Sequence, residues 1–201
     1  MAIDPTLQRL IQALTCQAGI GKKSAQRIAI QLLERNRSAA KTLAEALNDA
    51  VDTIHHCQQC RNYTTQTLCA ICENDQRDAS VVCVVENLAD MMAIEQASVF
   101  MGRYFVLMGR LSPIDGIGPA EIGLDLLIDQ VKTQGVKEVI IATSSTAEGE
   151  ATAYFLSASL QNEPVEITRI ANGVPMGGEL EYIDKDTLSY ALSRRERIDV
   201  D

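Results

Sequence analysis

The sequence lacks the features that mark membrane and secreted proteins. No apolar run approaches the roughly 18 residues that a transmembrane helix requires. The opening residues, MAIDPTLQRL, place an acid early and contain no long apolar core, so they do not resemble a secretory signal. Internal repeats and low-complexity stretches are absent as well. These absences predict a globular, cytoplasmic protein without membrane contact.

A nucleotide-binding P-loop is also missing, although the string GIGKKS at 19–24 has some likeness to one. A P-loop requires a glycine at the position of Cys16 and a serine or threonine at the position of Lys23. It also follows a strand, whereas a helix is predicted before Gly19. We therefore predict that this string does not bind a nucleotide.

Positive charge is scarce, with 18 Lys and Arg against 27 Asp and Glu and a net charge of −9. The deficit is uneven, because residues 1–53 carry a net +2 and residues 81–201 a net −10. Only the first segment has the charge to meet a phosphate backbone unaided. The acidic remainder fits a divalent metal, a basic protein partner or simple solubility.

Apolar periodicity predicts an all-helical start. Pro5 opens a helix over 5–14, the string at 19–21 breaks it, a second helix begins near Ser24, and Ser38 caps a third. The third helix carries Leu43, Leu47, Val51 and Ile54 at three- and four-residue spacing, and we expect a compact all-helical start.

The pattern changes at Ser80, where strands begin to alternate with helices. Val81–Val85 is a continuous apolar run, as in a buried parallel strand. Such alternation predicts an α/β fold with a mostly parallel sheet. The expected strands are 81–85, 104–108, 138–142 and 165–170, and the expected helices are 89–97, 120–134, 151–160 and about 186–195.

Four of the six cysteines lie in a polar stretch that is too poor in apolar residues to form a core. Two Cys-x-x-Cys pairs, eight residues apart, supply the four thiolates of a closed tetrahedral zinc site. In a cytosolic chain this clustering favours a metal over disulfides, and metal binding contributes directly to folding. We predict a structural Zn²⁺ held by Cys57, Cys60, Cys69 and Cys72.

Since four cysteines fill the zinc shell, His55 and His56 are expected at the surface or hydrogen-bonded around the site. Cys16 and Cys83 sit on apolar faces and are expected in the core.

Gly19 and Gly21 allow a tight chain reversal and a close approach of the backbone to another surface. The free N–H groups at the start of the next helix suit a phosphate oxygen, and Lys22, Lys23 and Arg27 add cations nearby. Such contacts would reach the DNA backbone and would be independent of base sequence. An ordinary turn with solvated lysines is the alternative.

Glu86 directly follows the first buried strand, and Asp90 lies one helical turn later. The carboxyl ends of parallel strands face the crevice where α/β proteins bind ligands. A catalytic metal would need more carboxylates there; strand 138–142 ends in Thr-Ser-Ser, but Glu148 and Glu150 follow it. We predict an incomplete catalytic site, with a single weak Mg²⁺ site or a docking surface for a basic partner in its place. A simple helix-capping role for Glu86 stays open.

Taken in order, these parts resemble the RecR family of bacterial recombination mediators. A helix-hairpin-helix precedes a four-cysteine zinc finger, and a module beginning Cys-Val-Val-Glu (83–86) resembles a Toprim domain. The resemblance spans essentially the whole chain, with further family-like strings at 19–27, 109–119, 148–153, 169–184 and 187–195.

The resemblance implies a multidomain α/β protein with four parts. These are a helix-hairpin-helix DNA-binding domain at 1–54, a zinc finger at 55–79, a Toprim domain with a Rossmann-like sheet at 80–163, and a Walker-B-like strand and helix at 164–201. No Walker A partner is present in the sequence, so we predict no ATP hydrolysis.

The resemblance also implies a role and partners. Members are non-catalytic mediators of DNA repair, acting with RecO and in some bacteria RecF to help RecA replace single-strand-binding protein on gapped DNA. A ring-like homo-oligomer, which we expect to be a tetramer, would encircle or clamp single-stranded, gapped or duplex DNA near the nucleoid. The family's DNA-contacting region corresponds to Lys22, Lys23 and Arg27 within the hairpin. Its partner-docking face corresponds to the Toprim acids Glu86 and Asp90, to which we add Glu148 and Glu150.

Three positions depart from the family pattern: Ala18 replaces a common proline, Phe105 a common histidine and Ser144 a usual asparagine. The main alternative function is a Toprim-type, metal-dependent DNA-processing enzyme. Strand passage would need a tyrosine nucleophile near the crevice, and neither Tyr104 nor Tyr154 has a motif around it. A pure adaptor that never touches DNA is a second alternative.

Overall fold

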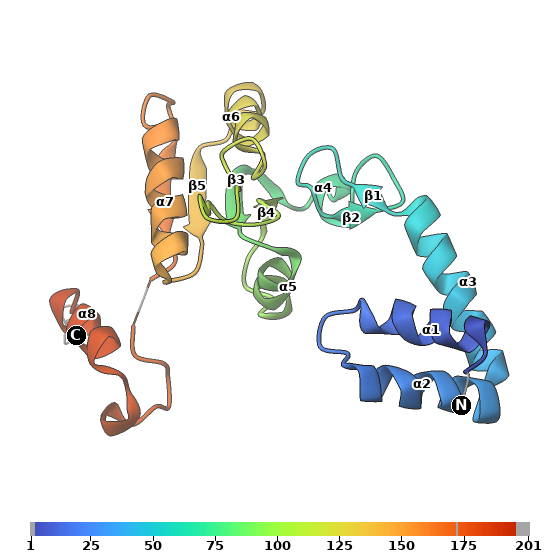
Figure 1. Ribbon diagram of the computed structural model, residues 1–201. Coiled ribbons are helices and arrows are strands. Elements are labelled where there is room, and N and C mark those ends of the chain that lie inside the picture. Colours follow the sequence, from blue (N-terminus) through green and yellow to red (C-terminus); the bar gives the residue numbers. More distant parts are fainter. Residues whose placement is uncertain (1–2, 172, 196–201) are drawn as a thin grey trace. The chain divides into compact units, whose positions relative to one another are not determined.

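The computed structural model describes residues 3–171 and 173–195. The chain divides into two compact units, Met1–His55 and His56–Asp201, which are described separately (Figure 1). Within the described residues, no helix combines the length and apolar character needed to cross a bilayer.

The first unit is a helical hairpin followed by a longer helix. Asp4 caps the first helix through Oδ1, which accepts a hydrogen bond from the Thr6 amide at 2.8 Å. Ala25 and Ala29 on the second helix are fully buried, and their small side chains let the first two helices approach closely. The helices are α1 (Pro5–Thr15), α2 (Lys22–Arg35) and α3 (Arg37–Thr53).

Two predicted helix starts were wrong. Helix α2 begins at Lys22 rather than Ser24, because Gly21 takes the extended N-cap conformation. Helix α3 is capped by Asn36, whose Oδ1 accepts from the Ala39 amide at 3.2 Å, and not by Ser38.

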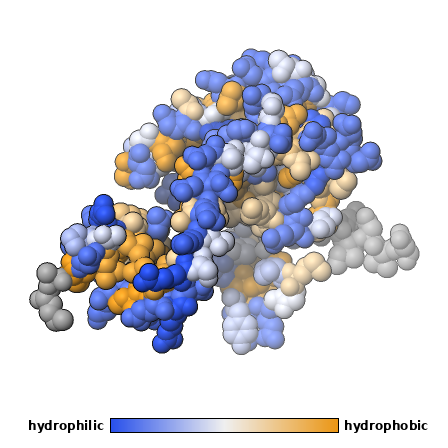
Figure 2. All heavy atoms as spheres, turned by 90° about the vertical axis from the view of Figure 1, so that its right-hand side faces the viewer, coloured by the Kyte–Doolittle hydropathy of each residue, from blue (hydrophilic) through white to orange (hydrophobic). Residues whose placement is uncertain are grey.

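The apolar residues that recur at three- and four-residue spacing on α3 are exposed. Helix α3 runs on beyond the α1–α2 pair, so its far half has no neighbour within this unit (Figure 1). Apolar atoms are visible on the surface of the N-terminal helices in Figure 2. The exposed fractions on α3 are 49% for Leu43, 57% for Leu47, 81% for Val51 and 43% for Ile54.

The second unit begins with a small cysteine-rich lobe and continues into a four-stranded sheet. Strands β1 (His55–His56) and β2 (Tyr63–Thr64) pair, and a one-turn helix α4 (Ala70–Glu73) follows. The larger sheet has the order β4-β3-β5-β6, and all three neighbouring pairs are parallel, which confirms the predicted α/β class. Its strands are β3 (Asp78–Val85), β4 (Gly102–Val106), β5 (Glu138–Ala142) and β6 (Glu166–Arg169).

Alternate residues of β3 enter two cores, as the period of two in a strand requires. Val82 and Val84 pack with the helices α6 and α7, and Cys83 and Val85 pack with α5 on the other face (Figure 1). Cys83 is therefore a core residue, as predicted, and burial raises the pKa of its thiol to about 12. The helices are α5 (Leu88–Gln96), α6 (Leu124–Thr133) and α7 (Ala147–Leu160).

Several boundaries differ from the sequence prediction. Strand β4 lies two residues earlier than expected, and α6 starts at Leu124 because Gly123 adopts a left-handed conformation with φ of 73°. Helix α7 starts at Ala147 instead of residue 151, because Thr146 caps it: the Thr146 hydroxyl accepts a hydrogen bond from the Gly149 amide at 3.2 Å. Glu148 and Glu150 consequently lie in the first turn of α7.

The last elements are a short 3₁₀ helix, η1 (Leu180–Tyr182), and α8 (Lys185–Ser193). Asp184 caps α8 by accepting from the Thr187 amide at 2.9 Å.

Candidate functional site

The four predicted zinc ligands form one buried cluster. The Sγ atoms of Cys57, Cys60, Cys69 and Cys72 all lie within 4.8 Å of one another. A tetrahedral Zn²⁺ with bonds of about 2.3 Å places its sulfurs about 3.8 Å apart, so the cluster has the right size. Each side chain is at most 3% exposed, which leaves no open coordination position for a substrate. The donor set and its burial fit a structural zinc ion.

Backbone turns aim the sulfurs at one point. In the first pair, the Arg61 amide donates to Cys57 O at 3.0 Å, and the Asn62 amide donates to Cys60 Sγ at 3.4 Å. In the second pair, the one-turn helix α4 follows directly on Cys69, whose amide donates to Cys57 Sγ at 3.3 Å. Amide-to-sulfur bonds of this kind orient thiolates around a metal.

The two histidines stay outside this cluster, as predicted. Both are exposed, and the His56 ring stacks on Tyr63 with 5.1 Å between the ring centroids. Cys16, by contrast, is exposed at the end of α1, so the prediction that it belongs to the core was wrong.

Arg61 joins the cysteine lobe to the sheet domain, and sequence reasoning missed it. Its guanidinium donates to the carbonyl oxygens of Leu107, Glu121 and Ile122, and it lies 5.9 Å from the centroid of the Phe105 ring. Burial lowers the pKa of Arg61. No local pattern marks this residue, because its partners lie 46 to 61 positions away.

Two more contacts strengthen this junction. The Val106 amide at the end of β4 donates to Cys60 O at 2.9 Å. Ile71 packs against both the cysteine cluster and the α5-side core. The zinc site and the sheet are therefore parts of one packed structure.

The α1–α2 hairpin presents open backbone next to unpaired cations. Gly19 has φ of 79°, which favours glycine, and a Cβ built on Gly19 or Gly21 would meet no atom within 4 Å. Gly21 offers no side chain to cap α2, so the first amides of the helix remain free for another acceptor. Because α2 starts at Lys22, both Lys22 and Lys23 belong to its first turn, and Arg27 follows one turn after Lys23.

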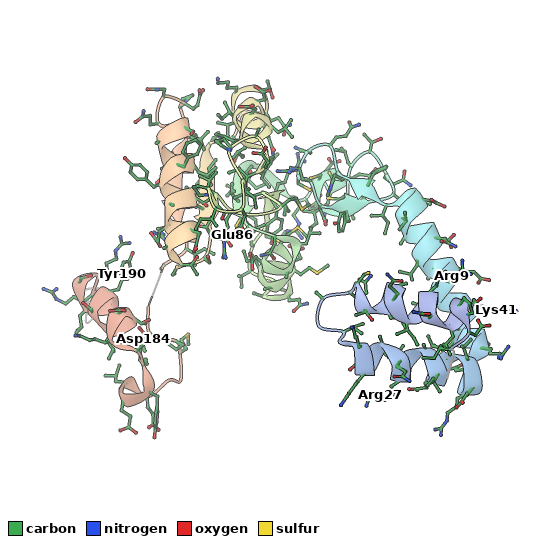
Figure 3. The ribbon with its side chains drawn as sticks, in the orientation of Figure 1. Arg9, Arg27, Lys41, Glu86, Asp184 and Tyr190 are labelled. Carbon is green, nitrogen blue, oxygen red and sulfur yellow. The ribbon has the colours of Figure 1, made fainter. Side chains whose placement is uncertain are left out.

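The structure thus brings all five predicted hairpin residues to one end of the first unit. Lys22, Lys23 and Arg27 form no ion pair with any described residue. Arg27 projects from α2 on the side away from α1 (Figure 3). The arrangement can bind a phosphate through helix-end amides and neighbouring charges.

The four acids predicted at the carboxyl end of the sheet differ in burial. We call this set the acidic sheet edge: Glu86, Asp90, Glu148 and Glu150. Glu86, at the end of β3, is 6% exposed, and its Oε1 accepts from the Ser144 amide at 2.8 Å and hydroxyl at 2.9 Å (Figure 3). Asp90 lies nearby on α5; desolvation, followed by the Glu86 charge, raises its pKa. Gly149 closes this corner, because a Cβ there would overlap Ser144.

The two remaining acids do not converge on Glu86. Glu150 forms a two-pronged ion pair with Arg169 at the end of β6, with N–O distances of 2.7 and 2.9 Å, and this hydrogen-bonded partner lowers the pKa of Glu150. Glu148 is exposed. Across the described residues, the four cysteines are the only group of three or more acids, histidines and cysteines placed to share a metal ion.

The positions that depart from the family pattern have different surroundings. Ser144 lies in the crevice as the partner of Glu86. Phe105 belongs to the core beneath Arg61, so its substitution bears on packing rather than on the crevice.

Tyr104 is unsuited to nucleophilic chemistry. It is fully buried, its hydroxyl donates to Glu95 Oε2 at 2.8 Å, and burial raises its pKa. Glu95 is paired in turn with Arg77, which also donates to Phe100 O at 3.0 Å. This cluster ties α5 to the start of β3.

Comparison with known proteins covers the whole arrangement. Residues 7–51 match a family described as RecR, helix-hairpin-helix; residues 54–74 match the four-cysteine zinc finger domain of RecR; residues 80–171 match a Toprim domain; and residues 173–196 match RecR, C-terminal. The zinc-finger match and the four-cysteine cluster together establish structural zinc binding, as predicted.

Two curated relatives carry the name Recombination protein RecR. The protein from Saccharophagus degradans is 52% identical over 195 residues, which cover 97% of this chain and 99% of the relative. The protein from Alcanivorax borkumensis is 49% identical over 195 residues, covering 97% and 98%. The helix-hairpin-helix match supports DNA binding. With all four parts matched in order and half of the residues identical to those of full-length relatives, the chain belongs to the RecR family.

Proposed function

We propose that this protein is a non-catalytic recombination mediator that acts in DNA repair. It binds gapped DNA through the α1–α2 hairpin and, together with RecO and RecF, helps RecA to replace single-strand-binding protein. The observation that carries the proposal is the hairpin: open glycine backbone, free helix-end amides and three unpaired cations lie together. These groups suit phosphate oxygens, whatever the base sequence.

The protein acts as a ring-like homo-oligomer, a tetramer, in this proposal. Support comes from the first unit, in which only Ala25 and Ala29 are buried among the described residues while α3 exposes a row of four apolar side chains. A unit with so little core gains stability when another surface covers that row. Several hairpins on one DNA molecule would raise the effective affinity, because each further contact becomes intramolecular.

In this proposal, the acidic sheet edge binds a basic partner such as RecO. Among the four acids there, Asp90 and Glu148 form no ion pair with a described residue, whereas Glu150 is paired with Arg169. Glu86 holds the β5–α7 turn through Ser144 and shapes this face without having to touch the partner.

Charge reversal at the hairpin tests the function. Replacing Lys22, Lys23 and Arg27 by glutamate should abolish retention of a labelled gapped duplex at low salt, because phosphate binding depends on these charges. Zinc content and oligomer mass should stay unchanged. Undiminished DNA retention would instead favour the adaptor that never contacts DNA.

The enzymatic alternative has its own test. Labelled DNA incubated with Mg²⁺ or Mn²⁺ should remain intact and unextended. Cleavage or synthesis that disappears in Glu86→Gln would overturn the non-catalytic proposal.

A further inference from the structure

Polar and basic side chains continue from the hairpin along one face of α2. Spacings of three and four residues place these side chains on the same side of a helix. We call this set the α2 row: Lys23, Gln26, Arg27, Gln31 and Arg35. All five are exposed, while Ala25 and Ala29 on the opposite side are buried against α1.

The α2 row lines a shallow, open hollow along α2. Its volume is about 550 Å³, and it runs from Lys23 in the first turn of α2 to Arg35 at its end. Two other side chains share the hollow: Ile30, which is 37% exposed, and the carboxylate of Glu34.

The charges in this hollow are available to a ligand. Lys23, Arg27 and Arg35 form no ion pair with any described carboxylate. The neighbouring Arg37 differs, because its Nε donates to Leu33 O at 2.8 Å. With one acid against three cations, the hollow favours an anion.

We infer that the α2 row is a phosphate-binding track, and that Arg35 is a DNA contact at its far end. The inference rests on the proposed DNA binding by the hairpin and extends it. Twelve residues of α-helix span about 18 Å, the axial length of about five nucleotides of one duplex strand. Lys23 and Arg27 hold the phosphates nearest the hairpin, Gln26 and Gln31 donate hydrogen bonds between, and Arg35 holds the last phosphate.

Glu34 limits the affinity of this track. Its carboxylate lies beside Arg35 in the same hollow and repels the phosphate that Arg35 attracts. Removing the Glu34 charge should therefore strengthen DNA binding, an effect that a bystander surface acid would not produce.

The test measures DNA affinity of the zinc-loaded, full-length protein against KCl concentration, by fluorescence anisotropy of a labelled 30-base-pair duplex. Arg35→Gln should weaken binding about three- to tenfold and reduce the slope of log K against log [salt] by about 0.9 for each protomer in contact. Arg35→Lys should keep the slope, because it keeps the charge and the favourable cation at the C-terminus of α2. Glu34→Gln should tighten binding.

Matched controls lie elsewhere in the same unit. Arg9→Gln on α1 and Glu45→Gln on α3 make the same charge changes outside the hollow and should leave the slope unaltered. A wild-type slope in Arg35→Gln, with Lys23→Gln still impaired, would overturn the track while leaving the hairpin function intact. If the wild-type protein bound no DNA, the proposed function itself would fail.

Discussion

At the scale of single residues, Arg61 holds the zinc finger to the sheet, although its polar local sequence does not indicate a structural role. Its guanidinium satisfies three carbonyl oxygens and covers Phe105, which fixes the zinc finger against the sheet. The cysteine spacing predicted the zinc ligands, because two Cys-x-x-Cys pairs this close in sequence are typical of a structural zinc site. Arg61 could not be predicted, because its role exists only once distant parts of the chain have folded together.

Removing the Arg61 side chain should destabilise the second unit. Arg61→Ala leaves three carbonyl oxygens without their charged donor, and we expect a loss of about 2 to 4 kcal/mol in the free energy of unfolding. Arg110→Ala, at an exposed position in the same domain, should change it little. Urea denaturation of both variants checks this, and equal midpoints would contradict the role assigned to Arg61.

A cysteine of the buried zinc cluster and the exposed Cys16 should respond differently to substitution. Cys69→Ser removes a buried zinc ligand, so zinc should be lost and the melting temperature should fall, since metal binding contributes to folding. Cys16→Ser changes an exposed thiol and should preserve both. Zinc content by mass spectrometry together with a thermal melt would reveal a failure, for instance full zinc occupancy in Cys69→Ser.

At the scale of elements, pattern and periodicity predicted the order of helices and strands better than their ends. Helix α2 begins two residues earlier than expected because Gly21 already takes an N-cap conformation, and this places Lys22 and Lys23 in the helix. The apolar spacing on α3 did not predict that this face is exposed, because amphipathic periodicity shows only that a face is apolar, not what covers it. The Glu86–Ser144 contact depends on β3 and β5 being neighbours, and a single sequence does not state that pairing.

The two hairpin glycines should tolerate substitution differently. Gly19→Ala forces a side chain into a left-handed conformation, at a cost of about 1 to 2 kcal/mol, and should loosen the hairpin and weaken DNA binding. Gly21→Ser occupies open space at an ordinary N-cap, where serine is favoured, and should leave stability equal or higher. Circular dichroism melts of the two variants give the comparison; the reverse order of stability would refute the assigned conformations.

Helix α5 should lose its anchor in acid. Desolvation of Glu95 acts to raise its pKa, but the hydrogen bonds from Arg77 and Tyr104 outweigh it and leave the pKa lowered. A carboxyl group whose pKa is lower in the folded than in the unfolded state stabilises the fold at pH values above the unfolded pKa of about 4.3. This stabilisation is lost as the pH falls through the folded-state pKa. Glu95→Gln should therefore cost about 2 kcal/mol at pH 7 and much less near pH 3. Exposed Glu179→Gln is the control, and a pH-independent difference for Glu95→Gln would contradict the pairing.

At the scale of the whole molecule, charge is divided unevenly along the chain. The first unit carries a net positive charge and the remainder most of the acids, so an acidic protein can still bind DNA. The order of parts along the chain allowed the family to be recognised from sequence. The proposed assembly that covers α3 would involve surfaces of other copies, and periodicity within one chain does not describe such surfaces.

The exposed α3 row should govern assembly. Leu47→Glu places a charge on an apolar face that is 57% exposed in one protomer, so it should split the oligomer without unfolding the protomer. DNA affinity should fall with it, because linked contacts are lost. Thr42→Glu, outside the row, is the control, and light scattering gives the mass. An unchanged mass in Leu47→Glu would remove α3 from the interface.

The central position of β3 has a consequence for how the protein is made. Its neighbours come from residues 102–106 and 138–142, so β3 is synthesised before both of its partner strands. During that interval its continuous apolar run has two open edges, a known route to aggregation. Nascent chains halted before residue 138 should therefore be the form most dependent on chaperones.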